Sequence, residues 1–270
     1  MSEKVLSSCV ESESGLHGIL FYRDLAHKRE VLLSFLRNGL EQGKSVVYVA
    51  GDESPQTIHR SMVGCGFDNE WFEKDGCLRV LRYDDWYIVD GRVRPNIVAL
   101  WKNAFEEALE KGFRGLHVCG EMSCFFKHGL VEELVKYEKS CGRRFTSPMS
   151  ALCAYSLDDL KFLEPESLLE VVNSHSHVFS PRFAGQFDFD GYSRLLTREK
   201  LVSLYGAAYA EEVISFLRIW RPLLDEDLGE GPEDFHTTLR SLIGPRADQV
   251  RELIVRDMYT DFGLEMTDTG

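Results

Sequence analysis

Apolar and polar positions follow two alternating periods along the first two thirds of the chain. Short apolar runs rich in strand-forming residues predict strands at 18–22, 45–50, 77–81, 115–119 and 150–155. Between them, apolar residues recur every three or four positions and predict helices at 29–40, 95–111, 125–140 and 165–173. Ser54 and Pro55 are typical of one further helix start. Repeated strand–helix units predict an α/β fold, a mostly parallel sheet with helices on both faces.

The pattern changes at 180–192, which is rich in Pro, Gly and aromatic residues. Beyond it, the helical period predicts two runs, 198–220 and 233–262, separated by the acidic loop 225–232. We therefore expect a flexible tail at 1–13, an α/β domain at 14–180, a linker at 181–192 and a small all-α domain at 193–270. The two helical runs share a short similarity that ends in Gly206 and Gly244.

Charge and composition narrow the class of protein. The formal net charge is −13, and an acidic chain gains little from binding phosphate backbones, so direct nucleic-acid binding is disfavoured. A leader-like apolar segment and a membrane-spanning run are missing from the sequence, so we expect a cytoplasmic protein without membrane contact. The seven cysteines are scattered without a CxxC pair, which favours reduced, mostly buried thiols. Cys119 and Cys124 are the pair that a metal or redox sensor would use.

The segment Tyr22–Arg29 occupies the strand–helix junction where a phosphate-binding loop would lie. Such loops need glycines, because backbone N–H groups must wrap the phosphates. Here Lys28 stands at the position of the phosphate lysine, but the glycines are absent and Arg29 replaces the magnesium-binding hydroxyl. A phosphate cradle is therefore not expected. The favoured interpretation of Lys28 is a solvated residue at a helix start, and the alternative is a residual contact with a nucleotide or anion.

Residues 51–81 resemble the KaiC-type ATPases in the order of their features. A strand ends in an acidic pair, and a Ser-Pro-Gln helix start, a Gly-aromatic-Asp turn and another strand follow. The resemblance implies a RecA-like fold. It places Asp52 and Glu53 on the family's acidic pair, where a glutamate helps to activate the attacking water.

The first domain also resembles a narrower family, the MEDS (methanogen/methylotroph, DcmR-type sensory) domain. The motifs that carry this resemblance are His17 with Phe21-Tyr22, Phe35-Leu36-x-x-Gly39-Leu40, Tyr87-x-x-Asp90-Gly91, Gly112-Phe113-x-Gly115-Leu116, Gly120-Glu121-Met122-Ser123, Tyr137-Glu138, Leu152-Cys153-x-Tyr155 and His177-Val178-Phe179. The resemblance implies a KaiC relative with a degenerate nucleotide loop that senses small molecules such as hydrocarbon derivatives. The second domain is similar to helical output modules of archaeal regulators.

A ligand site is expected where the carboxyl ends of the parallel strands meet. The predicted ligand-binding residues are Tyr22, Arg23, His27, Lys28, Asp52, Glu53, Glu121 and Tyr155. Two outcomes stay open: an open crevice with a mixed-charge rim, or a collapsed site whose charges pair with one another. Glu121 is interpreted equally well as a ligand contact and as a helix-start or ion-pair carboxylate. Glu138 is expected to be structural, as the partner of a buried donor.

The sequence offers no catalytic constellation, metal site or cofactor motif. His175 and His177 have strand spacing, but neither a cysteine nor a carboxylate adjacent in sequence completes a ligand set. We therefore expect one packed and one solvated histidine.

The function expected from these observations is a sensory and regulatory protein, not an enzyme. Its first domain would bind a small organic ligand, and its second would signal to a protein partner, with a homo-oligomer left open. The main alternative is a KaiC-like nucleotide-binding ATPase or phosphotransferase that uses Lys28 and Glu53. A third is a scaffold that docks a partner through its acidic surface.

Overall fold

The structure, a computed structural model, describes residues 15–67, 76–179, 186–215 and 235–262. The chain divides into two compact units, Met1–Phe187 and Asp188–Gly270. The expected flexible tail and the acidic loop 225–232 lie outside the described residues. The unit boundary falls within the stretch 181–192, although helix α10 (Phe189–Tyr205) already begins inside it.

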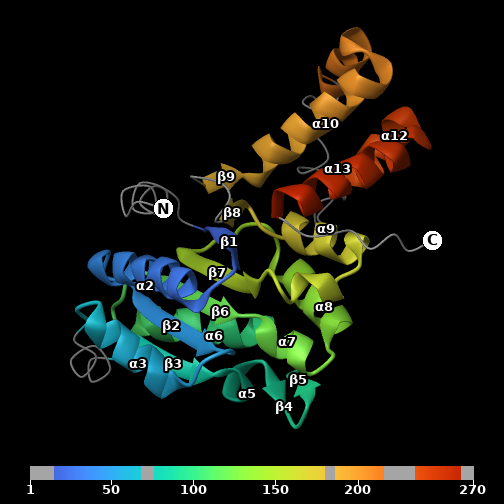
Figure 1. The fold of residues 1–270 in the computed structure, drawn as a ribbon. Helices are drawn as coiled ribbons and strands as arrows, with labels where there is room; N and C mark the ends of the chain where they lie inside the picture. Colours follow the sequence, from blue (N-terminus) through green and yellow to red (C-terminus); the bar gives the residue numbers. More distant parts are fainter. Residues whose placement is uncertain (1–14, 68–75, 180–185, 216–234, 263–270) are drawn as a thin grey trace. The chain divides into compact units, whose positions relative to one another are not determined.

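The first unit is built on one sheet whose strand order differs from their order in the sequence (Figure 1). Its strands lie in the order β3-β2-β6-β7-β1-β8-β9, and the first six strands pair with one another in parallel. Their bounds are β1 His17–Tyr22, β2 Ser45–Ala50, β3 Leu78–Arg82, β6 Leu116–Glu121, β7 Met149–Ser156, β8 His177–Phe179 and β9 Gln186–Asp188. The predicted α/β class and mostly parallel sheet are confirmed.

Helices cover both faces of this sheet (Figure 1). Two helices, α2 (Leu25–Glu41) and α3 (Pro55–Gly64), contact one face of the sheet. Two others, α6 (Ile97–Glu110) and α7 (Ser123–Lys127), contact the opposite face. The layer on that opposite face is completed by α8 (Val131–Cys141) and α9 (Pro165–Asn173). The remaining elements are α5 Tyr83–Trp86, the hairpin β4 Ile88–Val89 and β5 Arg92–Val93, and the short helix η1 Leu160–Phe162.

The α2 face is an apolar core. Val31, Leu32, Phe35 and Leu36 form a buried stripe along α2 and pack with strand residues such as Val46 and Leu152. Gly39 brings the end of α2 close to β6, because a Cβ there would lie 2.6 Å from the ring of His117. That ring stacks on Phe35 with centroids 4.6 Å apart. The predicted start of α3 is confirmed: Ser54 accepts a hydrogen bond from Thr57 N, and Pro55 is the first helical residue.

Three expected helices are divided by glycine. The helix predicted at 125–140 is wrong, because α7 ends at Lys127 and α8 begins at Val131, with Gly129 between them at φ +67°. The run predicted from 198 breaks at Gly206 (φ +88°), and the run 233–262 breaks at Gly244 (φ +63°). Only glycine adopts these left-handed values freely, so the helical period continues in sequence while the backbone turns.

The second unit is all-α in its described part. It contains α10, a helical stretch at 207–215, α12 (Phe235–Ile243) and α13 (Arg246–Phe262). Helix α13 packs on both α10 and α12, and Lys200 on α10 pairs with Asp257 on α13 at 2.5 Å. Among the described helices of either unit, none combines the length and the apolar character needed to cross a membrane.

Candidate functional site

The carboxyl edge of the sheet gathers polar and charged side chains from the ends of β1, β2 and β6. Tyr22 is the last residue of β1, Glu121 is the last of β6, and Asp52 and Glu53 follow β2. These residues meet around the side chain of Lys28, which comes from the first turn of α2. The predicted convergence at this edge therefore occurs for Tyr22 and Lys28 with the three carboxylates.

The junction between β1 and α2 is short. Only Arg23 and Asp24 separate the last strand residue, Tyr22, from the first helical residue, Leu25. Asp24 is the N-cap, and its carboxylate accepts a hydrogen bond of 2.8 Å from His27 N. A carboxylate thus already occupies the anion-attracting start of α2, and the junction has too few residues to wrap a phosphate chain.

Lys28 is buried, so its interpretation as a solvated residue is wrong. Its side chain is 0% exposed, and Nζ lies 2.8 Å from Glu121 Oε1, 3.2 Å from Asp52 Oδ2 and 3.5 Å from Glu53 Oε2. The ammonium also lies 5.3 Å from the centroid of the Tyr22 ring. Burial by itself lowers the pKa of Lys28, but the carboxylates of Glu121 and Asp52 outweigh it and raise that pKa overall. Lys28 is therefore a permanent cation inside the protein.

Glu121 accepts hydrogen bonds from several donors. Tyr48 Oη donates to Oε1, and the backbone N–H groups of Gly51 and Asp52 donate to Oε2 at 2.7 and 2.5 Å. Gly51 permits this approach, because a Cβ at that position would lie 2.9 Å from the carbonyl oxygen of Glu121. Donors on both oxygens fix the carboxylate beside Lys28, which is the ion-pair role considered from the sequence.

The other two carboxylates have further cations of their own. Asp52 accepts from Tyr22 Oη and lies 3.2 Å from Lys127 Nζ, while Glu53 is bound in bidentate fashion by Arg29. Burial raises the pKa of Asp52, but Lys28 and the hydrogen bonds outweigh it and lower that pKa to about 2. The three carboxylates and three cations, Lys28, Arg29 and Lys127, balance, so the cluster matches the collapsed, internally paired arrangement.

The remaining predicted ligand residues lie apart from this charge cluster. Arg23 is exposed. His27 is half-buried, and its Nδ1 has no hydrogen-bond partner among the described residues. Tyr155 is fully buried on the opposite face of the sheet, where its hydroxyl donates to Glu138. A ligand-binding role for the eight predicted residues stays a prediction, while the expectation that Glu138 accepts from a buried donor is confirmed.

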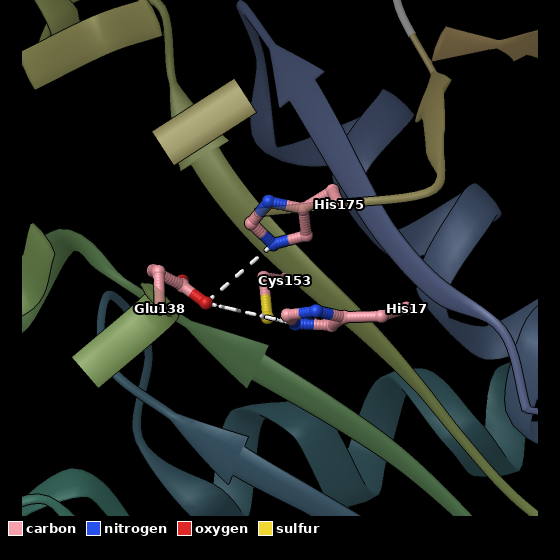
Figure 2. Close-up of side chains that lie close together, drawn as sticks. All are labelled: His17, Glu138, Cys153 and His175. Carbon is pink, nitrogen blue, oxygen red and sulfur yellow. Dashed lines mark hydrogen bonds and ion pairs between the residues drawn. The ribbon is translucent and has the colours of Figure 1, made fainter. Parts of the chain in front are cut away.

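A second polar centre lies on that opposite face. Figure 2 shows His17 from β1, Glu138 from α8, Cys153 from β7 and His175, two residues before β8, pointing toward one another. One donor atom from each side chain lies within 4.8 Å of the other three. We call these four residues the histidine–cysteine centre. The expectation of one solvated histidine is wrong, because both His175 and His177 are buried. Glu138 and Cys153 are distant from His175 in the sequence, and the fold brings their carboxylate and thiol close to its ring.

The ring orientations in this centre are set by backbone carbonyls. His17 Nδ1 lies 2.7 Å from Gly142 O and 2.9 Å from Ser174 O, and His175 Nδ1 lies 2.7 Å from Val171 O. A carbonyl can only accept, so each Nδ1 carries the proton. Each neutral ring then directs the Nε2 lone pair into the centre.

Burial favours the neutral form of every group in the centre. It lowers the pKa of His17 to about 4 against the opposing carbonyl hydrogen bonds, and it lowers the pKa of His175 as well. Burial also raises the pKa of Glu138 to about 7, with the hydrogen bond from Tyr155 opposing it, and raises the pKa of the Cys153 thiol. The centre is therefore a buried set of neutral or weakly acidic donors.

An aromatic cavity of about 10 Å³ adjoins this centre. His17 and Cys153 form part of its wall, and Tyr87, Trp101 and Tyr137 form another. Trp101 Nε1 donates to Tyr137 Oη at 2.9 Å, and Gly120 leaves room for Tyr87, whose hydroxyl would lie 2.2 Å from a Cβ at that position. This volume is about that of one water molecule.

Sequence reasoning missed this centre, although part of its signal was visible. His17, Glu138 and Cys153 all belong to motifs that carry the family resemblance, but these motifs are widely spaced in the chain. Only the strand order, with β1 between β7 and β8, brings them to His175.

The features now described define an α/β domain with a short, carboxylate-capped junction between β1 and α2, followed by a small helical unit. The chain belongs to the MEDS family, described as the MEthanogen/methylotroph, DcmR Sensory domain, which matches residues 16–176. This match confirms the family resemblance and supports a sensory or regulatory role.

Solved structures similar to this chain include a KaiC-like protein from the hyperthermophilic archaeon Pyrococcus horikoshii OT3, at 13% identity and a TM-score of 0.42. That similarity covers 62% of this chain and 71% of the other. A second protein from the same organism is similar at 9% identity and a TM-score of 0.44, over 69% of this chain and 91% of the other. A comparison with curated proteins found no significant match.

Proposed function

We propose that this protein senses a small organic molecule in its first unit, without hydrolysing ATP, and signals to a protein partner through its helical second unit. Its membership of a sensory-domain family supports the regulatory part of this proposal. The acidic net charge of −13 supports a protein rather than a nucleic acid as the partner.

One observation carries the absence of ATP hydrolysis: Lys28 is buried and neutralised by carboxylates. The junction between β1 and α2, with only two residues, adds to it. A triphosphate needs backbone N–H groups that wrap it and a lysine that is free to reach it. The start of α2 is instead capped by Asp24. Freeing Lys28 would leave Glu121 buried without its cation, which is energetically costly.

We place the organic ligand in the aromatic cavity rather than at the charge cluster, because the charges at the cluster are already paired. The cavity offers apolar walls from Trp101 and Ala151 and polar atoms from His17 and Cys153. Its volume of about 10 Å³ holds about one water molecule, so its walls must move apart to admit even a small organic ligand.

Two assays on the full chain test the proposal. The first measures steady-state phosphate release with Mg-ATP, and we expect only the background rate. Turnover above background that is lost in Lys28→Ala would contradict the proposal. The second is a thermal-shift screen of nucleotides against small organic molecules, in which a ligand at about one hundred times its Kd adds about 2.7 kcal/mol of stability.

A pair of variants locates the ligand. Ala151 lines the cavity, and Ala154 lies on the opposite face of the same strand in the α2 core. Ala151→Val fills the cavity and is expected to abolish stabilisation by the organic ligand, whereas Ala154→Val adds the same volume elsewhere and is expected to preserve it. Equal stabilisation of both variants would place the ligand outside the cavity.

A further inference from the structure

We propose that the histidine–cysteine centre binds one zinc ion through His17 Nε2, His175 Nε2, Cys153 Sγ and Glu138 Oε2. This inference shares His17 and Cys153 with the wall of the proposed ligand cavity, but it is tested with the metal alone, so its failure is distinguishable from a failure of the proposed small-molecule sensing.

The spacing of the donors fits a tetrahedral ion. Glu138 Oε2 lies 3.6 Å from His17 Nε2 and 3.5 Å from His175 Nε2, and Cys153 Sγ lies 3.5 Å from His17 Nε2. The distance from Cys153 Sγ to Glu138 Oε2 is 3.9 Å. Zinc bonds of about 2.0–2.3 Å place tetrahedral donors about 3.3–3.8 Å apart. The four side chains therefore need only small rotamer shifts to surround an ion.

The rings are oriented as metal ligands are. In metal sites, a ligating histidine usually donates its other ring N–H to a carbonyl or carboxylate, which fixes the tautomer. Both His17 and His175 do so here through Nδ1. Tyr155 Oη donates to Glu138 Oε1, which leaves Oε2 facing the two rings. The supporting contacts of a metal site are thus present around these ligands.

The protein alone leaves one of these lone pairs unsatisfied. His175 Nε2 is buried and has no hydrogen-bond partner among the described residues. The centre has at most two protons to offer, one from the Cys153 thiol and one from the Glu138 carboxyl. The separations of 3.6 and 3.5 Å from Glu138 Oε2 to His17 Nε2 and His175 Nε2 are long for hydrogen bonds. A cation at the centre satisfies all four donor atoms simultaneously.

The donor set selects zinc over the commoner hard cations. Thiolate and imidazole ligands favour zinc and related transition metals, whereas magnesium and calcium take oxygen ligands. On binding, the thiol proton and any carboxyl proton leave for solvent, and the thiolate and carboxylate together carry two negative charges. These cancel the charge of Zn²⁺, so the occupied centre is neutral in a fully buried position.

The test begins with the full chain after treatment with a chelator and removal of the chelator. Titration with Zn²⁺ is expected to saturate at one ion per chain and to raise the melting temperature of the first unit. Co²⁺ is expected to give the visible absorption of a tetrahedral site and a thiolate-to-cobalt charge-transfer band. Absence of a stoichiometric metal in the wild-type chain would overturn the proposal.

Matched variants assign the ligands. Cys153→Ser and His175→Gln are expected to lower zinc affinity by at least about 10-fold, and Cys153→Ser is expected to abolish the charge-transfer band. Cys119→Ser and His117→Gln are the controls, because both residues are buried in the same sheet outside the centre. Unchanged zinc affinity in Cys153→Ser and His175→Gln would overturn the assignment.

A measurement on the wild-type protein decides the matter even where a variant does not fold. X-ray absorption at the zinc edge is expected to show one sulfur and three nitrogen or oxygen neighbours. A shell of six oxygen or nitrogen neighbours without sulfur would show surface binding only and would overturn the proposal.

Discussion

Replacing Lys28 by methionine removes the cation at the middle of the charge cluster while keeping an unbranched side chain of similar length. Asp52 keeps Lys127, and Glu53 keeps Arg29. Glu121 loses the one cation that lies within 4 Å of it among the described ion pairs, although Tyr48 and two backbone N–H groups continue to donate to it. The variant therefore isolates the cost of an uncompensated buried carboxylate.

The expected loss of stability is about 3–5 kcal/mol, the usual effect of removing one partner from a buried ion pair. A unit of this size shifts its melting temperature by about 2–4 °C per kcal/mol, so the first unit is expected to melt about 6–20 °C lower. Differential scanning calorimetry measures this shift and separates it from the transition of the second unit.

Two further variants control the interpretation. Lys127→Met removes an ammonium that is 53% exposed and pairs with Asp52, so its expected cost is about 0–1 kcal/mol. Lys28→Met combined with Glu121→Gln removes the uncompensated charge and is expected to recover more than half of the loss. A melting temperature for Lys28→Met within about 2 °C of the wild type would refute the reasoning. So would a double variant less stable than Lys28→Met alone.

Two more predictions concern acid stability and helix packing. The pKa of Asp52 falls from 3.8 to about 2 on folding, so its ionisation contributes about 2 kcal/mol to the free energy of unfolding. This contribution is complete above pH 3.8 and is lost as the pH falls toward 2. In urea unfolding at several pH values, Asp52→Asn is expected to lack this pH-dependent component, and parallel pH profiles of the two proteins would contradict the prediction. Gly39→Ala places a methyl group against the His117 ring and is expected to lower the free energy of unfolding by about 1–3 kcal/mol. In Gly64→Ala the new methyl group meets nothing within 4 Å, and thermal unfolding is expected to show a gain of about 0.5–1 kcal/mol from the better helix former in α3. Equal melting temperatures for the two glycine variants would contradict this explanation of Gly39.

The sequence predicts the charge cluster because its geometry follows from a general property of parallel sheets. Tyr22, Asp52 and Glu121 each end or follow a strand, and the carboxyl ends of parallel strands share one edge. The burial of Lys28 is not predictable in the same way. A lysine in the first turn of a helix is usually solvated, and only the convergence of three carboxylates offsets its desolvation.

The histidine–cysteine centre is harder to predict, because its residues come from three separate elements and from the segment between α9 and β8. Cys153 and His17 lie on adjacent strands, but β7 and β1 are neighbours only in the folded sheet. Glu138 reaches them because α8 starts anew after Gly129, at a helix break that the amphipathic period does not show. Local spacing contains none of this information, whereas the strand order contains most of it.

Strand β1 carries residues of both polar centres on its two faces. His17 and Tyr22 are five positions apart, and side chains alternate along a strand, so they point to opposite sides of the sheet. An insertion or deletion of one residue between them would turn one of the two side chains to the wrong face. The length of this six-residue strand is consequently fixed by two unrelated requirements, and a change that repairs one centre cannot by itself repair the other. We expect length variation among natural variants to fall in the loops around β1 and to spare the strand itself.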